Sequence, residues 1–194
     1  MAVPDTVNLR NLSGTFNLNK TLSDSSDAAL KMQGIGWVVR QAVKYSNITL
    51  HVKQFVDENG LEHIDNEQVT TGNIRNTEER VVDYAWHEKD DKVFGMVTGR
   101  SRFVKLDEIE HDYLKQGWDE KFLAEGDREV FQSIVNSVGK KPNWTADQVW
   151  GFEVVDGQKR HTRRIIVKRG KEEYKLRLVY DWVVETDGDK DLAY

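Results

Sequence analysis

The residues best able to do chemistry lie near the C-terminus, where two tight turns set the pairing of three strands. Residues 156–157 (Asp-Gly) and 170–171 (Gly-Lys) have the composition of two-residue hairpin turns. Residues directly opposite each other share one face of a sheet, so these turns bring His161, Arg163 and Tyr180 together. The predicted inner face consists of Trp150, Phe152, His161, Arg163, Ile165, Leu176, Leu178 and Tyr180. The opposite face, predicted to meet solvent, consists of Glu153, Arg160, Thr162, Arg164, Lys175 and Arg177.

The polar groups on the apolar face have a functional and a structural interpretation. A buried guanidinium is costly unless it is paired. Arg163 is therefore either an anchor for a carboxylate, enolate or carbonyl, or a cation stacked on Trp150. His161 is either a general acid or base, or a hydrogen-bonded core residue beside Tyr180. If the protein is an enzyme, we expect His161, Arg163 and Tyr180 to be its catalytic residues.

Strands joined by short turns account for most of the chain, and we expect about eight of them. Residues 48–56 alternate apolar and polar side chains, and Asn59-Gly60 then predicts a type I′ turn into a return strand at 61–71. This pairing does not place His51 opposite His63, which argues against a two-histidine metal site. We expect no metal and no cofactor.

A middle hairpin is predicted from residues 80–86 and 92–104, joined by a charged turn at 88–91. Alternation gathers large side chains on one face, which consists of Val82, Tyr84, Trp86, Phe94, Met96 and Thr98. Inward aromatics suit a barrel that holds one small apolar molecule, and they suit a packed core equally well.

Two stretches have helical spacing instead. Ser25–Tyr45 predicts two short helices around a glycine elbow at Gly34 and Gly36. Asp107–Lys140 predicts two further helices, capped at Asp127 and stopped before Pro142, with Gly117 and Gly126 as hinges. Their apolar face, expected to pack on the barrel, consists of Trp118, Phe122, Leu123, Val130, Phe131, Ile134, Val135 and Val138. This segment is either a static cap or a gate, and it closes a monomer or meets its copy in a homodimer.

Composition narrows the class of protein. The 194 residues carry a net charge of −5, which argues against a nucleic-acid partner because such proteins need a basic surface. No apolar run approaches the about 20 residues that span a bilayer, so we expect no stable membrane insertion. The chain has no cysteine and shows no secretory signal, and we expect it to be cytoplasmic.

Four segments resemble one family in their order along the chain. They are SGTFNLNKTLSD at Ser13–Asp24, ALKMQGIGWVVRQA at Ala29–Ala42, IRNTEE at Ile74–Glu79 and the closing hairpins at Val154–Trp182. Together they resemble the fatty-acid-binding-protein branch of the lipocalin-like (calycin) superfamily. The resemblance implies one mainly β domain over residues 1–194: a single antiparallel meander β-barrel with an N-terminal helix-turn-helix and an inserted helical segment at about 107–140.

The family's closing strand usually presents Arg-x-Tyr as an anchor for a ligand carboxylate. Here Tyr180 matches the tyrosine, but Leu178 occupies the arginine position and Arg177 lies one residue away. The resemblance also places Met32 and Trp37 in the helix pair at the barrel mouth, as a portal or as simple packing. The predicted ligand-binding set is Met32, Trp37, Tyr84, Trp86, Met96, Trp150, Phe152, His161, Arg163, Leu178 and Tyr180.

Two functions follow from this set. The first is an intracellular lipocalin-like protein that binds an apolar small molecule, a lipid or secondary metabolite, in the barrel. The alternative is a cofactor-free enzyme that uses the same cavity, namely a cyclase, pericyclase or isomerase of a lipophilic biosynthetic intermediate. The extra helical segment favours the enzyme, because a plain carrier does not need a second lid.

Overall fold

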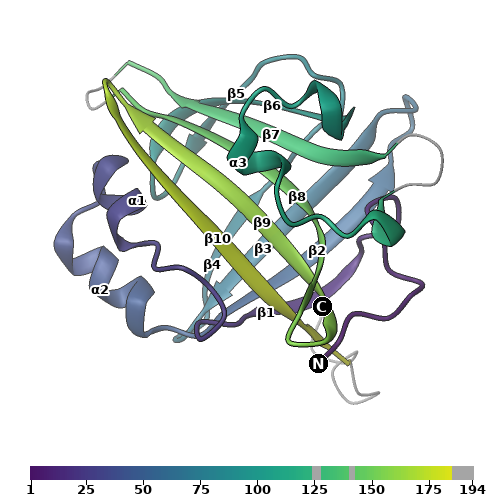
Figure 1. Ribbon diagram of the computed structural model, residues 1–194. Helices are drawn as coiled ribbons and strands as arrows, with labels where there is room; N and C mark the ends of the chain where they lie inside the picture. Colours follow the sequence, from purple (N-terminus) through teal and green to yellow (C-terminus); the bar gives the residue numbers. More distant parts are fainter. Residues whose placement is uncertain (124–127, 140–142, 185–194) are drawn as a thin grey trace.

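Ten antiparallel strands form one curled sheet in the computed structural model, which describes residues 1–123, 128–139 and 143–184 (Figure 1). The sheet order is β4-β3-β2-β1-β10-β9-β8-β7-β6-β5. Strands that follow each other in the chain are therefore neighbours except β4 and β5, and β1 lies between β2 and the last strand, β10. The strands are β1 (Gly14–Leu18), β2 (Ile48–Val56), β3 (Glu62–Thr70), β4 (Ile74–Glu78), β5 (His87–Asp91), β6 (Gly95–Lys105), β7 (Glu129–Ser137), β8 (Thr145–Val155), β9 (Gln158–Arg169) and β10 (Glu172–Val183). The predicted meander barrel is confirmed, with β4 and β5 as its two edges.

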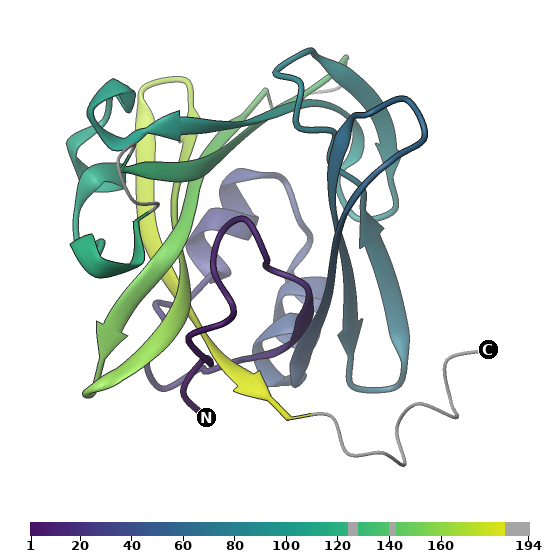
Figure 2. The same cartoon turned by 90° about the vertical axis from the view of Figure 1, so that its right-hand side faces the viewer.

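The glycine elbow between two short helices is also confirmed. The helices are α1 (Asp27–Met32) and α2 (Trp37–Tyr45), and Gly34 between them has a positive φ of 84°. The Tyr174 hydroxyl donates to the Ser25 carbonyl at 3.2 Å, which ties the start of this pair to β10. Figure 2 shows both helices across one opening of the curled sheet.

The strand register predicted at the two C-terminal turns is confirmed. Arg163 pairs with Trp150 on β8 and with Leu178 on β10, and His161 pairs with Phe152 and Tyr180 in the same way. Because both turns contain two residues, the pairing continues without a bulge along all three strands.

The β2–β3 register differs from the prediction by one residue. A five-residue loop connects the strands, because the Asp57 carboxylate accepts hydrogen bonds from the backbone N–H groups of Asn59 and Leu61. His51 consequently lies opposite Glu67 instead of Gln68, and the two histidines of this hairpin are still not opposite each other.

The middle hairpin turns later than predicted. Residues 88–91 belong to β5, and the turn lies at 92–94, where the Asp91 carboxylate accepts from the N–H groups of Val93 and Phe94. The predicted strand at 80–86 is irregular, and Tyr84 has a positive φ of 59°. The turn thus forms where the Asp91 carboxylate accepts hydrogen bonds from the backbone, and the charged run at 88–91 is part of a strand instead.

Only the first half of the predicted helical insertion is helical. It contains a 3₁₀ turn at Leu106–Glu108, the short helix α3 (Asp112–Lys115) and a second 3₁₀ turn at Glu120–Phe122. The stretch with the strongest helical spacing is strand β7. Four successive residues of β7, Val130 to Ser133, are buried, because one face meets the barrel interior and the other lies under the insertion. A strand covered on both faces loses its alternating pattern, which explains the error. The predicted cap, second hinge and stop at Asp127, Gly126, Lys140 and Pro142 lie outside the described residues.

The insertion also changes the face that was predicted to meet solvent. It packs on the outside of β8 and β9 through an apolar cluster of Val104, Leu106, Ile109, Leu114, Trp118, Leu123, Val130, Val149 and Ile166 (Figure 1). Glu153, Arg160, Thr162 and Arg164 on that outer face are buried, and the insertion lies against Glu153 and Arg164. The predicted packing of Trp118 and Leu123 on the barrel is confirmed, whereas Val130, predicted on a helix, is part of strand β7. The role of the insertion as a gate stays a prediction. No helix among the described residues is long and apolar enough to cross a membrane.

Candidate functional site

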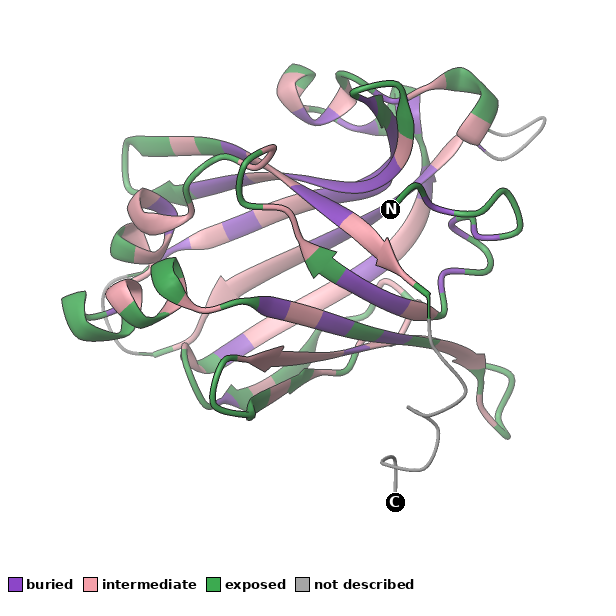
Figure 3. Ribbon diagram, turned by 90° about the horizontal axis from the view of Figure 1, so that it is seen from below, coloured by how far each residue is buried: buried purple, intermediate pink, exposed green. Residues whose placement is uncertain are grey.

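The curled sheet and the helix pair enclose a cavity of about 600 Å³. Apolar side chains from β2, β9, β10 and the helices form most of its wall, including Leu30, Val43, Ile48, Leu50, Ile165, Val167, Leu176 and Leu178. Helix α2 has no fully buried residue and borders the cavity through Val39, Ala42 and Val43 (Figure 3). A volume of this size accommodates one drug-sized molecule.

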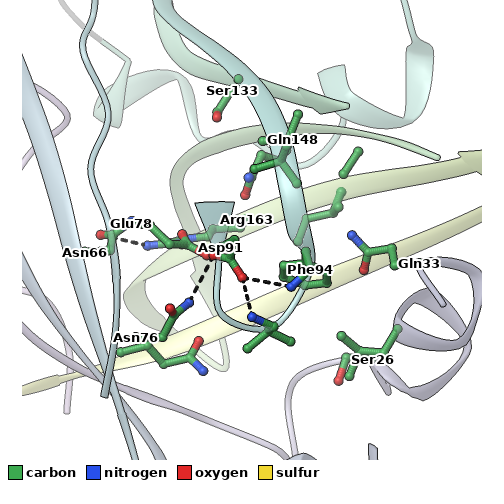
Figure 4. Close-up of a pocket in the computed structure, with 18 of the residues that line it drawn as sticks. Ser26, Gln33, Asn66, Asn76, Glu78, Asp91, Phe94, Ser133, Gln148 and Arg163 are labelled. Atoms are coloured by element: carbon green, nitrogen blue, oxygen red, sulfur yellow. Dashed lines mark hydrogen bonds between the residues drawn. The ribbon is translucent and has the colours of Figure 1, made fainter. Parts of the chain in front are cut away.

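One wall of the cavity is polar, and Arg163 is its most buried charged group. Its Nε donates to Nε2 of His161 at 3.2 Å, and its Nη2 donates to Oδ1 of Asn66 at 3.5 Å. Figure 4 shows the Arg163 side chain of β9 and the Asn66 side chain of β3 pointing toward each other. The guanidinium carbon lies 3.7 Å from the centre of the Trp150 ring, so both proposed roles of Arg163, cavity group and stacked cation, have a geometric basis.

His161 lies behind this wall and is fully buried. Its Nδ1 is 3.2 Å from the Gly151 carbonyl oxygen, and its Nε2 accepts from Arg163, so both ring nitrogens are occupied. Burial lowers the pKa of His161 well below its ordinary value, and the neighbouring Arg163 lowers it further. The ring is therefore neutral, with its proton on Nδ1. It does not line the cavity, and this geometry gives it no path for proton transfer to a ligand.

A second guanidinium, Arg80, lies in the same wall. Its Nη2 is 2.5 Å from the Glu78 carboxylate, and its Nε donates to the Ser133 hydroxyl at 3.3 Å. Burial would raise the pKa of Glu78, but the charge and hydrogen bond of Arg80 outweigh it and bring that pKa below its ordinary value. The Arg80 guanidinium carbon lies 4.9 Å from the Trp150 ring centre, so one indole contacts both arginines.

Tyr180 completes the polar wall. Its ring stacks on His161 with centroids 5.4 Å apart, and Arg163 lies 5.1 Å from its centroid. Burial raises the pKa of its hydroxyl, while Arg163 opposes that shift, so the phenol is neutral at pH 7.

A smaller polar group bridges the two edge strands. Asn76 of β4 donates to the Asp91 carboxylate of β5 at 3.4 Å, as drawn in Figure 4, and Lys89 donates to the Thr77 carbonyl at 2.7 Å. Side chains thus connect the edges where no backbone pairing occurs. Among the described residues, no group of three metal-ligating side chains lies together.

The structure separates the predicted site residues into three groups. Arg163, Leu178 and Tyr180 line the cavity. Trp150, Phe152 and His161 form the core layer behind its wall. The remaining five, Met32, Trp37, Tyr84, Trp86 and Met96, lie outside the cavity wall.

The placement of four of these residues outside the cavity wall has local causes. The late turn of the middle hairpin reverses the predicted alternation, so Val97 and Ser101 face the cavity and Met96 is exposed. Tyr84 and Trp86 stack on Arg100, with its guanidinium carbon 4.1 and 4.6 Å from their ring centres. Trp37 is exposed on α2.

Sequence reasoning missed Arg80, Glu78 and Asn66. Asn66 occupies an inward position of β3, two residues from the buried Ile64, and that alternation was a usable signal. Arg80 carried no such signal, because it follows the end of β4 in irregular backbone.

The cavity and its arginine wall can be compared with known proteins. No known family profile matches the chain. It is 31% identical over 191 residues to the pericyclase pydY of an Acremonium species, covering 94% of this chain and 97% of that protein. It is 33% identical over 187 residues to the probable pericyclase scpY of Mollisia scopiformis, covering 94% of this chain and 95% of that protein. The chain belongs to the family of these two proteins.

Solved structures agree on the fold. Caenorhabditis elegans lipid binding protein 8 matches with a TM-score of 0.58 at 14% identity, over 91% of this chain and 99% of that chain. A Schistosoma mansoni fatty acid binding protein, solved with arachidonic acid, matches with a TM-score of 0.54 at 14% identity, over 89% of this chain and 96% of that chain. These matches confirm the fatty-acid-binding-protein-like fold that the sequence predicted.

Proposed function

We propose that this member of the pydY family is a cofactor-free pericyclase that cyclises one flexible, unsaturated apolar molecule inside the barrel. The observation that carries the proposal is the cavity of about 600 Å³, apolar on most sides, with two guanidinium groups in one wall. The names of the two relatives support a pericyclic reaction over other chemistries of such a cavity.

The apolar walls act on the shape of the substrate. A linear polyene in water samples many conformers, and few of them bring the reacting carbons together. A closed cavity of matching volume removes most of these conformers, and such orientation supplies several kcal/mol of the barrier. In a cycloaddition two π bonds are replaced by two σ bonds within the substrate, so the protein neither gives nor takes an electron or a proton.

The polar wall acts on the electrons of the substrate. A guanidinium that donates a hydrogen bond to a conjugated carbonyl withdraws electron density from the adjacent double bond, which becomes more reactive toward a diene. Fixed donors in a buried site interact more strongly than donors in water and need no reorganisation during the reaction. Arg80 and Arg163 supply the guanidinium groups of this wall, and Arg163 is held in place by His161, Asn66 and Trp150. His161 is thus a positioning residue in this mechanism.

The experiment adds the purified chain to an extract of an Acremonium strain that lacks pydY. The expected result is the conversion of a linear precursor into a cyclic isomer of the same mass, followed by liquid chromatography and mass spectrometry. A cavity-filling variant, Leu178→Trp, should lose this activity. The matched control Val154→Trp places the same ring on an exposed position of β8 and should keep it. Unchanged isomer ratios with folded protein would overturn the proposal.

A carrier for an apolar small molecule is the second candidate, and the fold shared with fatty-acid-binding proteins supports it. A carrier releases its ligand unchanged, whereas a pericyclase releases an isomer, so mass and retention time of the extracted ligand separate the two. A cytoplasmic location, the absence of a nucleic-acid partner and a monomeric or homodimeric state remain predictions for either function.

A further inference from the structure

The two arginines of the polar wall differ in the hydrogen bonds that their donors make. Arg163 donates through Nε to His161 and through Nη2 to Asn66, and its flat face covers Trp150. Arg80 donates through Nε and Nη2, but its Nη1 is buried and has no hydrogen-bond partner. Only 9% of the Arg80 side chain is exposed, so solvent does not satisfy that donor.

Asn66 presents a second unused donor in the same wall. Its Oδ1 accepts from Arg163, while its Nδ2 is buried without a partner. Both residues line the cavity. A buried donor without an acceptor is destabilising, so two of them in one cavity wall indicate a missing acceptor.

The charges of the wall point to the kind of acceptor that is missing. Arg80 and Arg163 bring two positive charges to the Trp150 ring, and Glu78, which pairs with Arg80, supplies one negative charge. Among the described residues Arg163 forms no ion pair, and burial of an unpaired charge is unfavourable. An oxygen atom with full or partial negative charge would compensate the charge and accept both unused hydrogen bonds.

We propose that Arg80 is the catalytic residue that contacts the substrate, and that its Nη1 and the Asn66 Nδ2 receive a conjugated carbonyl or enolate oxygen. This inference rests on the proposed function and narrows its substrate class to molecules with one such oxygen at the end of an apolar chain. Arg163 is then the fixed support that orients Asn66, and Glu78 is the counterion that holds Arg80 in place and competes with the substrate oxygen.

Two fluorescent probes of similar shape test this assignment in the full chain. 1-Anilinonaphthalene-8-sulfonate carries an anionic oxygen group, and N-phenyl-1-naphthylamine is its uncharged counterpart. In Arg80→Gln we expect sulfonate binding to weaken by about 10- to 100-fold, because one hydrogen bond to a charged group is lost. Binding of the uncharged probe should stay within about twofold, since its contacts are apolar.

Three further variants distinguish a direct contact with the ligand from a structural role of the polar wall. Glu78→Gln should strengthen sulfonate binding, because the competing carboxylate is gone; a merely structural role of the pair predicts weaker binding in both variants. Asn66→Asp keeps the shape and the contact with Arg163 but replaces the free donor with an acceptor, so it should abolish sulfonate binding even if Arg80→Gln fails to fold. The matched control Arg75→Gln removes an exposed arginine on β4, outside the cavity wall, and should change nothing.

The outcomes separate the inference from the function on which it rests. Sulfonate binding to Arg80→Gln or Asn66→Asp that equals wild type overturns the role of Arg80 and Asn66. Failure of the uncharged probe to bind wild type contradicts the cavity as a ligand site, and with it the proposed function. Binding of both probes to every variant without distinction leaves a cavity that binds apolar molecules but has no oxygen-binding wall.

Discussion

His161 and Arg163 form a hydrogen bond between neighbouring inward positions of β9, with Arg163 Nε 3.2 Å from His161 Nε2. The other ring nitrogen of His161 is 3.2 Å from the Gly151 carbonyl oxygen on β8. A backbone carbonyl therefore fixes the histidine tautomer, and the histidine fixes the direction of the guanidinium. The hydrogen bonds of a neutral histidine thus hold the guanidinium in place, without an ion pair to a carboxylate of its own among the described residues.

His161→Phe should lower the free energy of unfolding by about 1–3 kcal/mol, because it leaves the buried Arg163 Nε without an acceptor while keeping an aromatic ring among Phe16, Phe152 and Tyr180. Urea titration followed by tryptophan fluorescence measures this change. His87→Phe, at an exposed histidine, is the control. A variant as stable as wild type would mean that the histidine does not support the guanidinium.

The stability of the protein should depend on pH through the same residue. Burial lowers the pKa of His161 in the folded state, so below about pH 6.5 the unfolded chain binds a proton that the folded chain does not. The contribution is complete above that pH and is lost as the pH falls, by up to about 1.4 kcal/mol per pH unit. Urea titrations at pH 7.5, 6.5 and 5.5 should show a gap between wild type and His161→Phe that shrinks toward acid. A constant gap would contradict a neutral buried ring.

The C-terminal part of the site could be predicted from the sequence because local signals decide it. The two-residue turns set the register of β8, β9 and β10, and that register brings His161 and Arg163 next to Tyr180. No distant segment is needed for this step. The sequence therefore predicted the apolar face, the buried Arg163 and the neighbouring ring of Tyr180.

The rest of the site depends on contacts between distant segments. Arg80 reaches Ser133 of β7 across the barrel, and Asn66 reaches Arg163 of β9, and neither pair has a local signature. The outer face of β9 looked solvated because Glu153 and Arg164 alternate with apolar residues, yet the insertion covers it. The same alternation of charged and apolar residues is found in a strand with a solvent-exposed face and in a strand whose outer face carries a buried ion-pair network.

Glu153→Gln should destabilise the protein by about 3–5 kcal/mol, because two arginines lose their counterion. The cost is at the lower end of this range if the side chain of Arg177, which is more exposed than that of Arg164, turns toward solvent. The Glu153 carboxylate is 3% exposed and accepts from Arg164 Nε and Arg177 Nη1, each at 3.0 Å. The amide keeps the shape but leaves two arginines without their counterion. Thermal unfolding followed by circular dichroism measures the loss. Glu172→Gln, at an exposed carboxylate of β10, should have no effect, and an equal shift in both variants would assign the loss to net charge alone.

Gly151→Ala should destabilise the protein through the insertion. A Cβ atom at this position would lie 2.6 Å from Cε3 of Trp118, so the indole must move away from β8 at a cost of about 1–3 kcal/mol. Trp118→Ala alone should cost about 3–5 kcal/mol by leaving a void. In the double variant the alanine at 151 has no ring to displace, so its cost should nearly vanish, and a double-mutant cycle by urea titration measures this coupling. Gly36→Ala is the control, because its Cβ would meet nothing within 4 Å. Additive costs of the two substitutions would show that the indole does not rest on Gly151, and the insertion would then lack its central contact with the strand whose carbonyl orients His161.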